Sequence, residues 1–164
     1  MKILFKFATR SRPTKFLSCL ENIVSKLSDK ENYQVLVSYD DDDSSMTDMF
    51  ERCKPYKFDS HLLFCGGLSK NKIHAINRDI ERVTDWDILI NMSDDMVFIQ
   101  EGFDDIIRND MNKYFPDGDC LLHFPDQHQG ENCMTMSIMD SKYYARPGYI
   151  YHPDYESLWC DKEA

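Results

Sequence analysis

The chain has 164 residues, 42% of them hydrophobic and 29% charged, which predicts a single globular domain over residues 1–164 and argues against a disordered or fibrous protein. With 29 acidic and 19 basic residues, the net charge of −10 opposes general binding of nucleic acid or of an anionic membrane surface. An anionic substrate remains compatible with this charge if a cation lies between it and the protein. No apolar run approaches the roughly 18 residues of a membrane span.

The six cysteines form no C-x-x-C pair and are scattered among apolar positions. A domain of this length needs no disulfide bonds for stability. The pattern therefore predicts reduced, mostly buried cysteines in a cytoplasmic protein. A zinc site is the alternative interpretation, but the paired spacing typical of zinc ligands is missing.

The chain begins with a short apolar strand over residues 2–8, closed by a polar turn. An amphipathic helix is predicted from Pro13 onward, with Arg12 or Ser11 near its cap. Its apolar positions have helical spacing: Phe16, Leu17, Leu20, Ile23, Val24 and Leu27.

The second strand is predicted over residues 33–39 and ends abruptly in four aspartates at 40–43. A short helix follows over residues 46–53, because its apolar positions repeat at intervals of three and four. Ser44 or Ser45 is the predicted cap of this helix.

The middle of the chain continues the alternation. A strand over residues 61–65 precedes a helix over 73–83, and a buried strand over 86–92 follows. That strand ends in Ser93-Asp94-Asp95, after which the spacing of apolar residues predicts a helix over 103–111.

Two further strands are predicted over residues 119–124 and 133–139, with a polar loop between them. Alternating strands and helices with short loops predict an α/β fold with a mostly parallel central sheet and helices on both faces. In such sheets ligands bind at the carboxyl ends of the strands. Three strands end in charged segments, namely residues 9–12, 40–43 and 94–95.

Carboxylates gathered at one sheet edge repel one another unless they face water or surround a divalent cation. Mn²⁺ and Mg²⁺ commonly take one or two carboxylates together with phosphate oxygens of a substrate. Four nearby cations are candidates for the remaining phosphate charge: Arg10, Arg12, Lys70 and Lys72. The constellation therefore suits a metal-bound nucleotide diphosphate, although a solvated turn is the simpler interpretation of the run at 40–43.

Five segments, taken in chain order, carry a resemblance to a known family: Thr9–Pro13, Asp41–Ser44, Lys72–Ile80, Ser93–Asp95 and Trp159–Glu163. They are similar to the nucleotide-binding turn, the D-D-x-S turn, the K-x-x-A-x-N-x-G-I helix, the D-x-D-type motif and the late E-D segment of the family 2 glycosyltransferases. The chain thus resembles a GT-A-fold glycosyltransferase domain over nearly its whole length. Members of that family usually continue with a further helix beyond the last of these segments.

Three positions depart from the family pattern. Ser93 stands where the D-x-D-type motif has its first acid, and Asp79 stands where the helix motif has glycine. Cys160 takes the place of the acid that usually precedes the catalytic base.

The resemblance implies a metal-dependent, inverting transfer of a sugar from a nucleotide-diphosphate sugar to a sugar or glycan acceptor. It implies Asp161 as the catalytic base, with Glu163 as its substitute. Asp95 and its neighbour Asp94 are the implied ligands of Mn²⁺ or Mg²⁺. The implied donor-binding residues are Thr9, Arg12, Asp41, Asp42, Lys72 and Asp94.

Three other functions remain as alternatives. A non-catalytic GT-A-like module would bind a sugar or nucleotide through the same residues and transfer nothing. A nucleotidyltransferase is disfavoured because the turn after the first strand, T-R-S-R-P, lacks the glycines of a phosphate loop, and a phosphatase because no D-x-D follows that strand.

Overall fold

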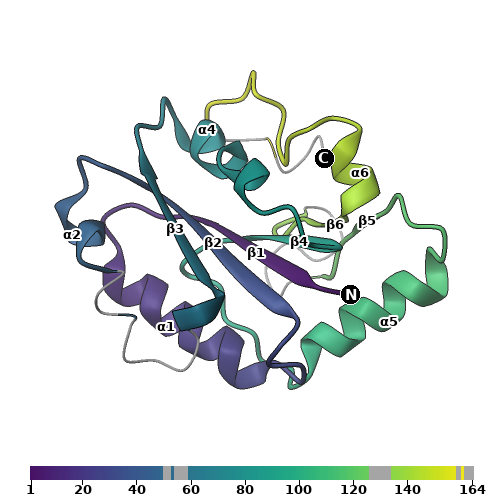
Figure 1. Ribbon diagram of the computed structural model, residues 1–164. Coiled ribbons are helices and arrows are strands. Elements are labelled where there is room, and N and C mark those ends of the chain that lie inside the picture. The colour runs from purple at the N-terminus through teal and green to yellow at the C-terminus, as the bar shows by residue number, and fades with distance from the viewer. Residues whose placement is uncertain (50–52, 54–58, 126–133, 158–159, 161–164) are drawn as a thin grey trace.

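The computed structural model describes residues 1–49, 53, 59–125, 134–157 and 160 (Figure 1). These residues contain a six-stranded sheet with the order β3-β2-β1-β4-β6-β5. The strands are β1 (Ile3–Ala8), β2 (Tyr33–Asp40), β3 (Leu62–Gly67), β4 (Ile88–Met92), β5 (Leu121–Leu122) and β6 (Ile138–Asp140). β1 pairs in parallel with β2 and β4, and β2 with β3, whereas β6 runs antiparallel to both β4 and β5. The predicted mostly parallel α/β sheet is confirmed.

Helices cover both faces of this sheet, as predicted (Figure 1). α1 and α5 lie on one face, and α4 and α6 lie on the other. The helices are α1 (Pro13–Lys26), α2 (Ser44–Thr47), α4 (Lys72–Asn77), α5 (Phe103–Tyr114) and α6 (Ser141–Ala145), with 3₁₀ turns η1 (Asp59–His61) and η2 (Ile80–Arg82).

Each face of the sheet has its own apolar core because side chains alternate along a strand. On β1, Ile3, Phe5 and Phe7 pack toward α1 and α5. Leu4 packs on the opposite side, against the isoleucines of α4 and η2. This alternation makes Lys6 an inward-facing residue on the α4 face, and its side chain is fully buried.

The first helix follows the predicted pattern. α1 begins at Pro13, whose missing N–H is no loss in a first turn, and Arg12 is its N-cap residue without a capping side-chain bond. The buried positions are Phe16, Cys19, Leu20 and Ile23. The predicted cap of the next helix is wrong: the Asp43 carboxylate, rather than Ser44 or Ser45, accepts the Ser45 N–H at the start of α2.

The predicted helix over 73–83 is interrupted. α4 ends at Asn77, and Asp79 adopts a left-handed conformation with φ of 70° before η2 begins. Such a backbone favours glycine, which explains the glycine in the similar family motif. The Asp79 carboxylate here accepts hydrogen bonds from Ser38 and Arg82.

The last two strands are shorter than predicted. β5 covers Leu121–Leu122 within the predicted 119–124, and β6 covers Ile138–Asp140 at the end of the predicted 133–139. Residue 133, the first of the predicted strand 133–139, lies outside the residues that the structure describes.

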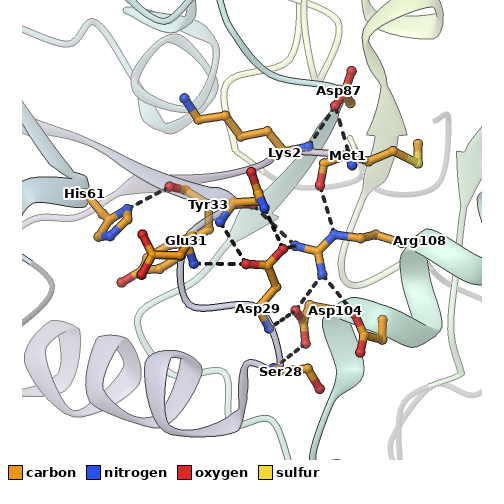
Figure 2. Close-up of polar contacts among 12 residues, drawn as sticks. Met1, Lys2, Ser28, Asp29, Glu31, Tyr33, His61, Asp87, Asp104 and Arg108 are labelled. Atoms are coloured by element: carbon orange, nitrogen blue, oxygen red, sulfur yellow. Dashed lines mark hydrogen bonds and ion pairs between the residues drawn. The ribbon is translucent and has the colours of Figure 1, made fainter.

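A charged cluster fastens α5 to the amino-terminal edge of the sheet (Figure 2). Asp104 is fully buried, and its carboxylate accepts the N–H groups of Ser28 and Asp29. Arg108, one turn along α5, donates to Asp104 at 2.6 Å and to the carbonyl of Met1 at 2.9 Å. Burial opposes ionisation of Asp104, but these hydrogen bonds hold the pKa of its carboxyl below the usual value.

The five cysteines in the described part of the chain, Cys19, Cys53, Cys65, Cys120 and Cys160, are all buried, as predicted. Burial raises the pKa of the Cys19 thiol to about 12, so this thiol is unreactive at neutral pH. In the same part of the chain, no helix has the length and apolar character to cross a membrane.

Candidate nucleotide-sugar site

Three charged loops emerge at the same edge of the sheet. Ala8 at the end of β1 pairs with Ser38 of β2, and Phe7 pairs with Met92 at the end of β4. The three strands are parallel, so the segments that follow them leave the sheet side by side. The structure confirms that the loops at 9–12, 40–43 and 93–95 share the carboxyl edge.

Asp94 connects the loop after β4 to the loop after β1. Its side chain is 5% exposed. One carboxylate oxygen accepts the Thr9 hydroxyl at 3.0 Å, and the other accepts Nη1 of Arg12 at 3.0 Å. Two predicted donor-site residues are therefore brought into direct contact with a third.

Asp95 is far more accessible, with 58% of its side chain exposed. Its Oδ1 accepts the Ser93 hydroxyl, and its Oδ2 lies 3.9 Å from Nη1 of Arg12. The hydrogen bond from Ser93 holds the pKa of the Asp95 carboxyl below its usual range. At neutral pH this edge of the sheet thus presents an ionised and accessible carboxylate.

The aspartate run at 40–43 is tied to the β1 loop by Arg10. Its guanidinium donates to both carboxylate oxygens of Asp42, at 2.6 and 2.9 Å, and to Asp40 at 2.6 Å. The hydrogen bond from Arg10 lowers the pKa of Asp42. Asp43 is buried and accepts the backbone N–H of Ser11, so it fixes the loop rather than a ligand.

Asp41 has a more peripheral position. It is exposed, and its backbone N–H donates to the Gly67 carbonyl at 2.9 Å. A Cβ on Gly66 would lie 2.3 Å from the Asp41 carboxylate, so this exposed side chain would have to move if Gly66 were replaced.

A pocket of about 490 Å³ opens between these loops and the start of α4. Its volume falls within the usual range for small-ligand sites. Thr9, Asp42 and Lys72, all predicted donor-site residues, share its wall. The full lining is Ala8, Thr9, Arg10, Ser38, Tyr39, Asp40, Asp42, Ser69, Asn71, Lys72 and Ala75.

A second pocket, of about 380 Å³, lies between α1 and the loop after β4. Asp94 and Asp95 form one side of it, and Lys15 and Cys19 lie on the other. Asp94, which also accepts the Thr9 hydroxyl, thus connects this pocket to the wall of the larger one.

The side chains present fit a cation held mainly by the substrate. Mg²⁺-type ions are commonly bound through one or two carboxylates plus phosphate oxygens and water, and Asp95 supplies one accessible carboxylate. The Asp94 carboxylate, by contrast, already accepts hydrogen bonds from Thr9 and Arg12. In the described ranges no group of three His, Cys, Asp or Glu residues is arranged to hold a metal by itself.

Most of the predicted site residues lie close together, and two of them lie outside the residues that the structure describes. Thr9, Arg12, Asp94 and Asp95 are linked by direct contacts, whereas Asp42 and Lys72 line the adjoining pocket. The two predicted catalytic residues, Asp161 and Glu163, fall outside the described residues.

Sequence reasoning missed several parts of the site. The ion pairs of Arg10 with Asp40 and Asp42 were not predicted, and its contact with phosphate charge stays a prediction. Ser38 and Asn71 line the pocket without any motif that singles them out. The sequence does contain one indication that Lys6 has a special role, because Lys6 is the only charged residue in the otherwise apolar strand β1.

The chain matches no family model and no curated protein. Two solved structures share its fold at 12% sequence identity. One is the mannosyltransferase PcManGT from Pyrobaculum calidifontis in complex with GDP-Man and Mn²⁺, with a TM-score of 0.73 over 98% of this chain and 49% of that one. The other is S. aureus TarS 1-349, with a TM-score of 0.75 over 99% of this chain and 53% of that one.

The chain therefore has a fold found in a known glycosyltransferase, as the resemblance in the sequence predicts. It spans about half the length of these two structures.

Proposed function

We propose that the protein is a metal-dependent, inverting glycosyltransferase that moves a sugar from a nucleotide-diphosphate sugar to the hydroxyl of a sugar or glycan acceptor. One observation carries the proposal: three parallel strands deliver Thr9, Asp42 and Asp95 to one edge, where Thr9 and Asp42 line a pocket of about 490 Å³ and Asp95 lines a second pocket of about 380 Å³. The fold shared with a mannosyltransferase in complex with GDP-Man and Mn²⁺ supports it.

In this proposal the pocket between β1, β2 and α4 takes the nucleotide. Lys72 supplies positive charge to the diphosphate, and Arg10 lies beside it on the same wall. Asp42 and Thr9 offer hydrogen-bonding groups to the base and ribose. The ion pair with Arg10 keeps Asp42 ionised and oriented before the ligand arrives.

Asp95 would hold a divalent cation, with the phosphate oxygens of the donor as the further ligands that such ions commonly take. When bound, Mn²⁺ or Mg²⁺ neutralises charge on the departing diphosphate. Asp94 positions Asp95 indirectly, because its hydrogen bonds with Thr9 and Arg12 fix the loop that carries both aspartates.

Asp161 accepts the proton of the attacking hydroxyl, with Glu163 as the substitute. A single base, with no nucleophile from the protein, gives inversion at the anomeric carbon, by the same stereochemical logic as in inverting glycoside hydrolases.

A non-catalytic nucleotide-sugar-binding module is the second candidate. The observation that favours it is the S-D-D sequence at the end of β4, where a hydroxyl replaces one acid and Asp94 is buried in internal contacts. Such a module binds the donor and releases no nucleotide from it, so turnover separates the two candidates.

Removal of Asp95 tests the metal-dependent donor site. We expect a nucleotide diphosphate such as UDP or GDP to bind wild type about tenfold more tightly with Mn²⁺ than with EDTA, a difference of roughly 1.4 kcal/mol. In Asp95→Ala that difference disappears, because the accessible carboxylate is gone. Isothermal titration calorimetry with and without metal measures it.

Asp85→Ala is the matched control. This carboxylate is also exposed, but it pairs with Lys2 at the amino end of the sheet. Its substitution leaves the metal effect unchanged. Equal affinity of wild type with Mn²⁺ and with EDTA contradicts a metal-dependent site.

A further inference from the structure

A lysine is buried directly behind the candidate pocket. Lys6 lies in the middle of the central strand β1 and is fully inaccessible. Burial of an ammonium group is costly unless hydrogen bonds and opposite charge compensate it. Its Nζ donates to the Ser38 hydroxyl and, at 3.4 Å, to the Phe7 carbonyl.

Ser38 connects this lysine to the pocket. It forms part of the pocket wall, yet it is 1% exposed and its hydroxyl is directed to the interior of the α4 face. The same hydroxyl donates to Oδ2 of Asp79 at 2.7 Å. Lys6, Ser38 and Asp79 therefore form a continuous buried chain, hereafter the Lys6 chain, whose middle member borders the proposed donor site.

Asp79 is surrounded by cations. Its carboxylate lies 3.2 Å from Nε of Arg78 and 3.2 Å from Nε of Arg82. Arg78 also donates to the carbonyls of Tyr39 and Cys65, at the ends of β2 and β3. Two arginines thus flank Asp79, and Lys6 reaches the same carboxylate through the Ser38 hydroxyl.

The neighbouring strand carries an unsatisfied acceptor. Asn91 pairs with Lys6 in the register of β4 with β1, and its Nδ2 donates to the Tyr151 hydroxyl at 3.3 Å. Its Oδ1 is buried and accepts no hydrogen bond from the described residues. A protonated lysine has three N–H donors, and Ser38 and Phe7 accept two of them, so the charged form of Lys6 keeps one N–H beyond these bonds.

We propose that Lys6 is a positioning residue of the donor pocket, whose positive charge acts across Ser38 on a bound diphosphate and favours the nucleotide-bound state. This inference rests on the proposed function, because it needs an anionic ligand above Ser38. The contribution is electrostatic, since Lys6 itself touches no ligand.

The titration of Lys6 makes the proposal measurable. Burial lowers the pKa of Lys6 to about 7, and the negative charge of Asp79 partly opposes this. An anionic diphosphate favours the charged lysine, so binding takes up a proton. Affinity is then highest below pH 7 and falls as the pH rises through that value. The charged or titratable groups that act on Lys6 are Asp79, Arg78, Cys65 and Glu81.

The probes are GDP-mannose and UDP-glucose with Mg²⁺, because their diphosphate is esterified at both ends and lacks the phosphate ionisation near pH 6. If the ligand raises the pKa of Lys6 by one unit, wild-type affinity falls by about tenfold between pH 6 and pH 8.5. Calorimetry at pH 7.5 in two buffers of different ionisation enthalpy should show net proton uptake.

Lys6→Met retains the length of the side chain and removes its charge. Replacement of a buried ion by an apolar residue is often tolerated, so we expect the variant to fold. It should bind the donor with an affinity independent of pH and without proton uptake. Ser38→Ala, which keeps the lysine but removes the hydroxyl that holds its Nζ behind the pocket, should weaken the uptake and serves as the second variant should Lys6→Met not fold. Lys113→Met, at an exposed position on α5, should behave as wild type.

The outcomes separate the two proposals. A wild type that binds neither probe at any pH contradicts both the proposed function and the role of Lys6. A wild type that binds, with Lys6→Met or Ser38→Ala showing the same pH profile and proton uptake, contradicts the role of Lys6 alone.

Discussion

Asp161→Asn lowers sugar transfer by about 10²–10⁴-fold, which is the usual contribution of a general base to the rate. It leaves the donor affinity nearly unchanged. The amide keeps the shape and hydrogen-bonding capacity of the carboxylate but no longer accepts the proton of the acceptor hydroxyl. The measurement pairs donor binding with the release of nucleotide diphosphate in the presence of a panel of sugar acceptors.

Glu163→Gln is the matched variant for this experiment. If it abolishes transfer while Asp161→Asn retains it, the base is Glu163. A wild type that binds nucleotide sugars but transfers to no acceptor and hydrolyses no donor supports the non-catalytic module instead.

Asp104→Asn destabilises the fold by about 3 kcal/mol, because it removes one partner of a buried ion pair. The fully buried carboxylate accepts two backbone N–H groups and the Arg108 guanidinium, and an amide satisfies only part of this set (Figure 2). Asp105 still faces Arg108 at 3.2 Å, which keeps the loss at the lower end of the range for such pairs. Urea unfolding followed by circular dichroism measures the change.

The pH dependence of stability gives this prediction a second readout. The pKa of Asp104 is lower in the folded chain than in the unfolded chain. Its contribution is therefore present above about pH 4, the unfolded value, and is lost as the pH falls through the lower folded-state value. Asp104→Asn should lose less stability than wild type upon acidification. Asp85→Asn, at an exposed carboxylate, should change stability by less than about 0.5 kcal/mol, and an equal loss in both variants contradicts the account.

The sequence predicted the central elements well where periodicity is strong. The helical spacing from Phe16 to Leu27 and the apolar runs before Asp40 and Ser93 correspond to α1, β2 and β4 within one or two residues. These segments are long enough for their period to be read without tertiary information. The shared edge of the charged loops followed from strand alternation alone.

Other features depend on contacts that no local pattern encodes. The break in the helix over 73–83 comes from the left-handed backbone at Asp79, which its bonds to Ser38 and Arg82 hold in place. β5 and β6 are too short to show a period of two, so neither their length nor their antiparallel direction was readable.

The candidate site was predicted in its residue types rather than in its pairings. Four aspartates in a row gave no indication that Asp43 is buried against Ser11 while Asp42 is exposed beside Arg10. The adjacent pair Asp94 and Asp95 likewise divides into an internal and an accessible carboxylate. Such divisions arise from the backbone direction at the strand end, which the sequence does not specify.

The measurement that tests the central claim most directly is a crystal structure of the protein with a nucleotide diphosphate and Mn²⁺. We predict the nucleotide in the pocket lined by Thr9, Asp42 and Lys72, with its phosphates and the cation beside Asp95. A nucleotide bound elsewhere, such as in the pocket of about 190 Å³ lined by Phe115 and Lys142, would contradict the assignment of the carboxyl edge as the donor site.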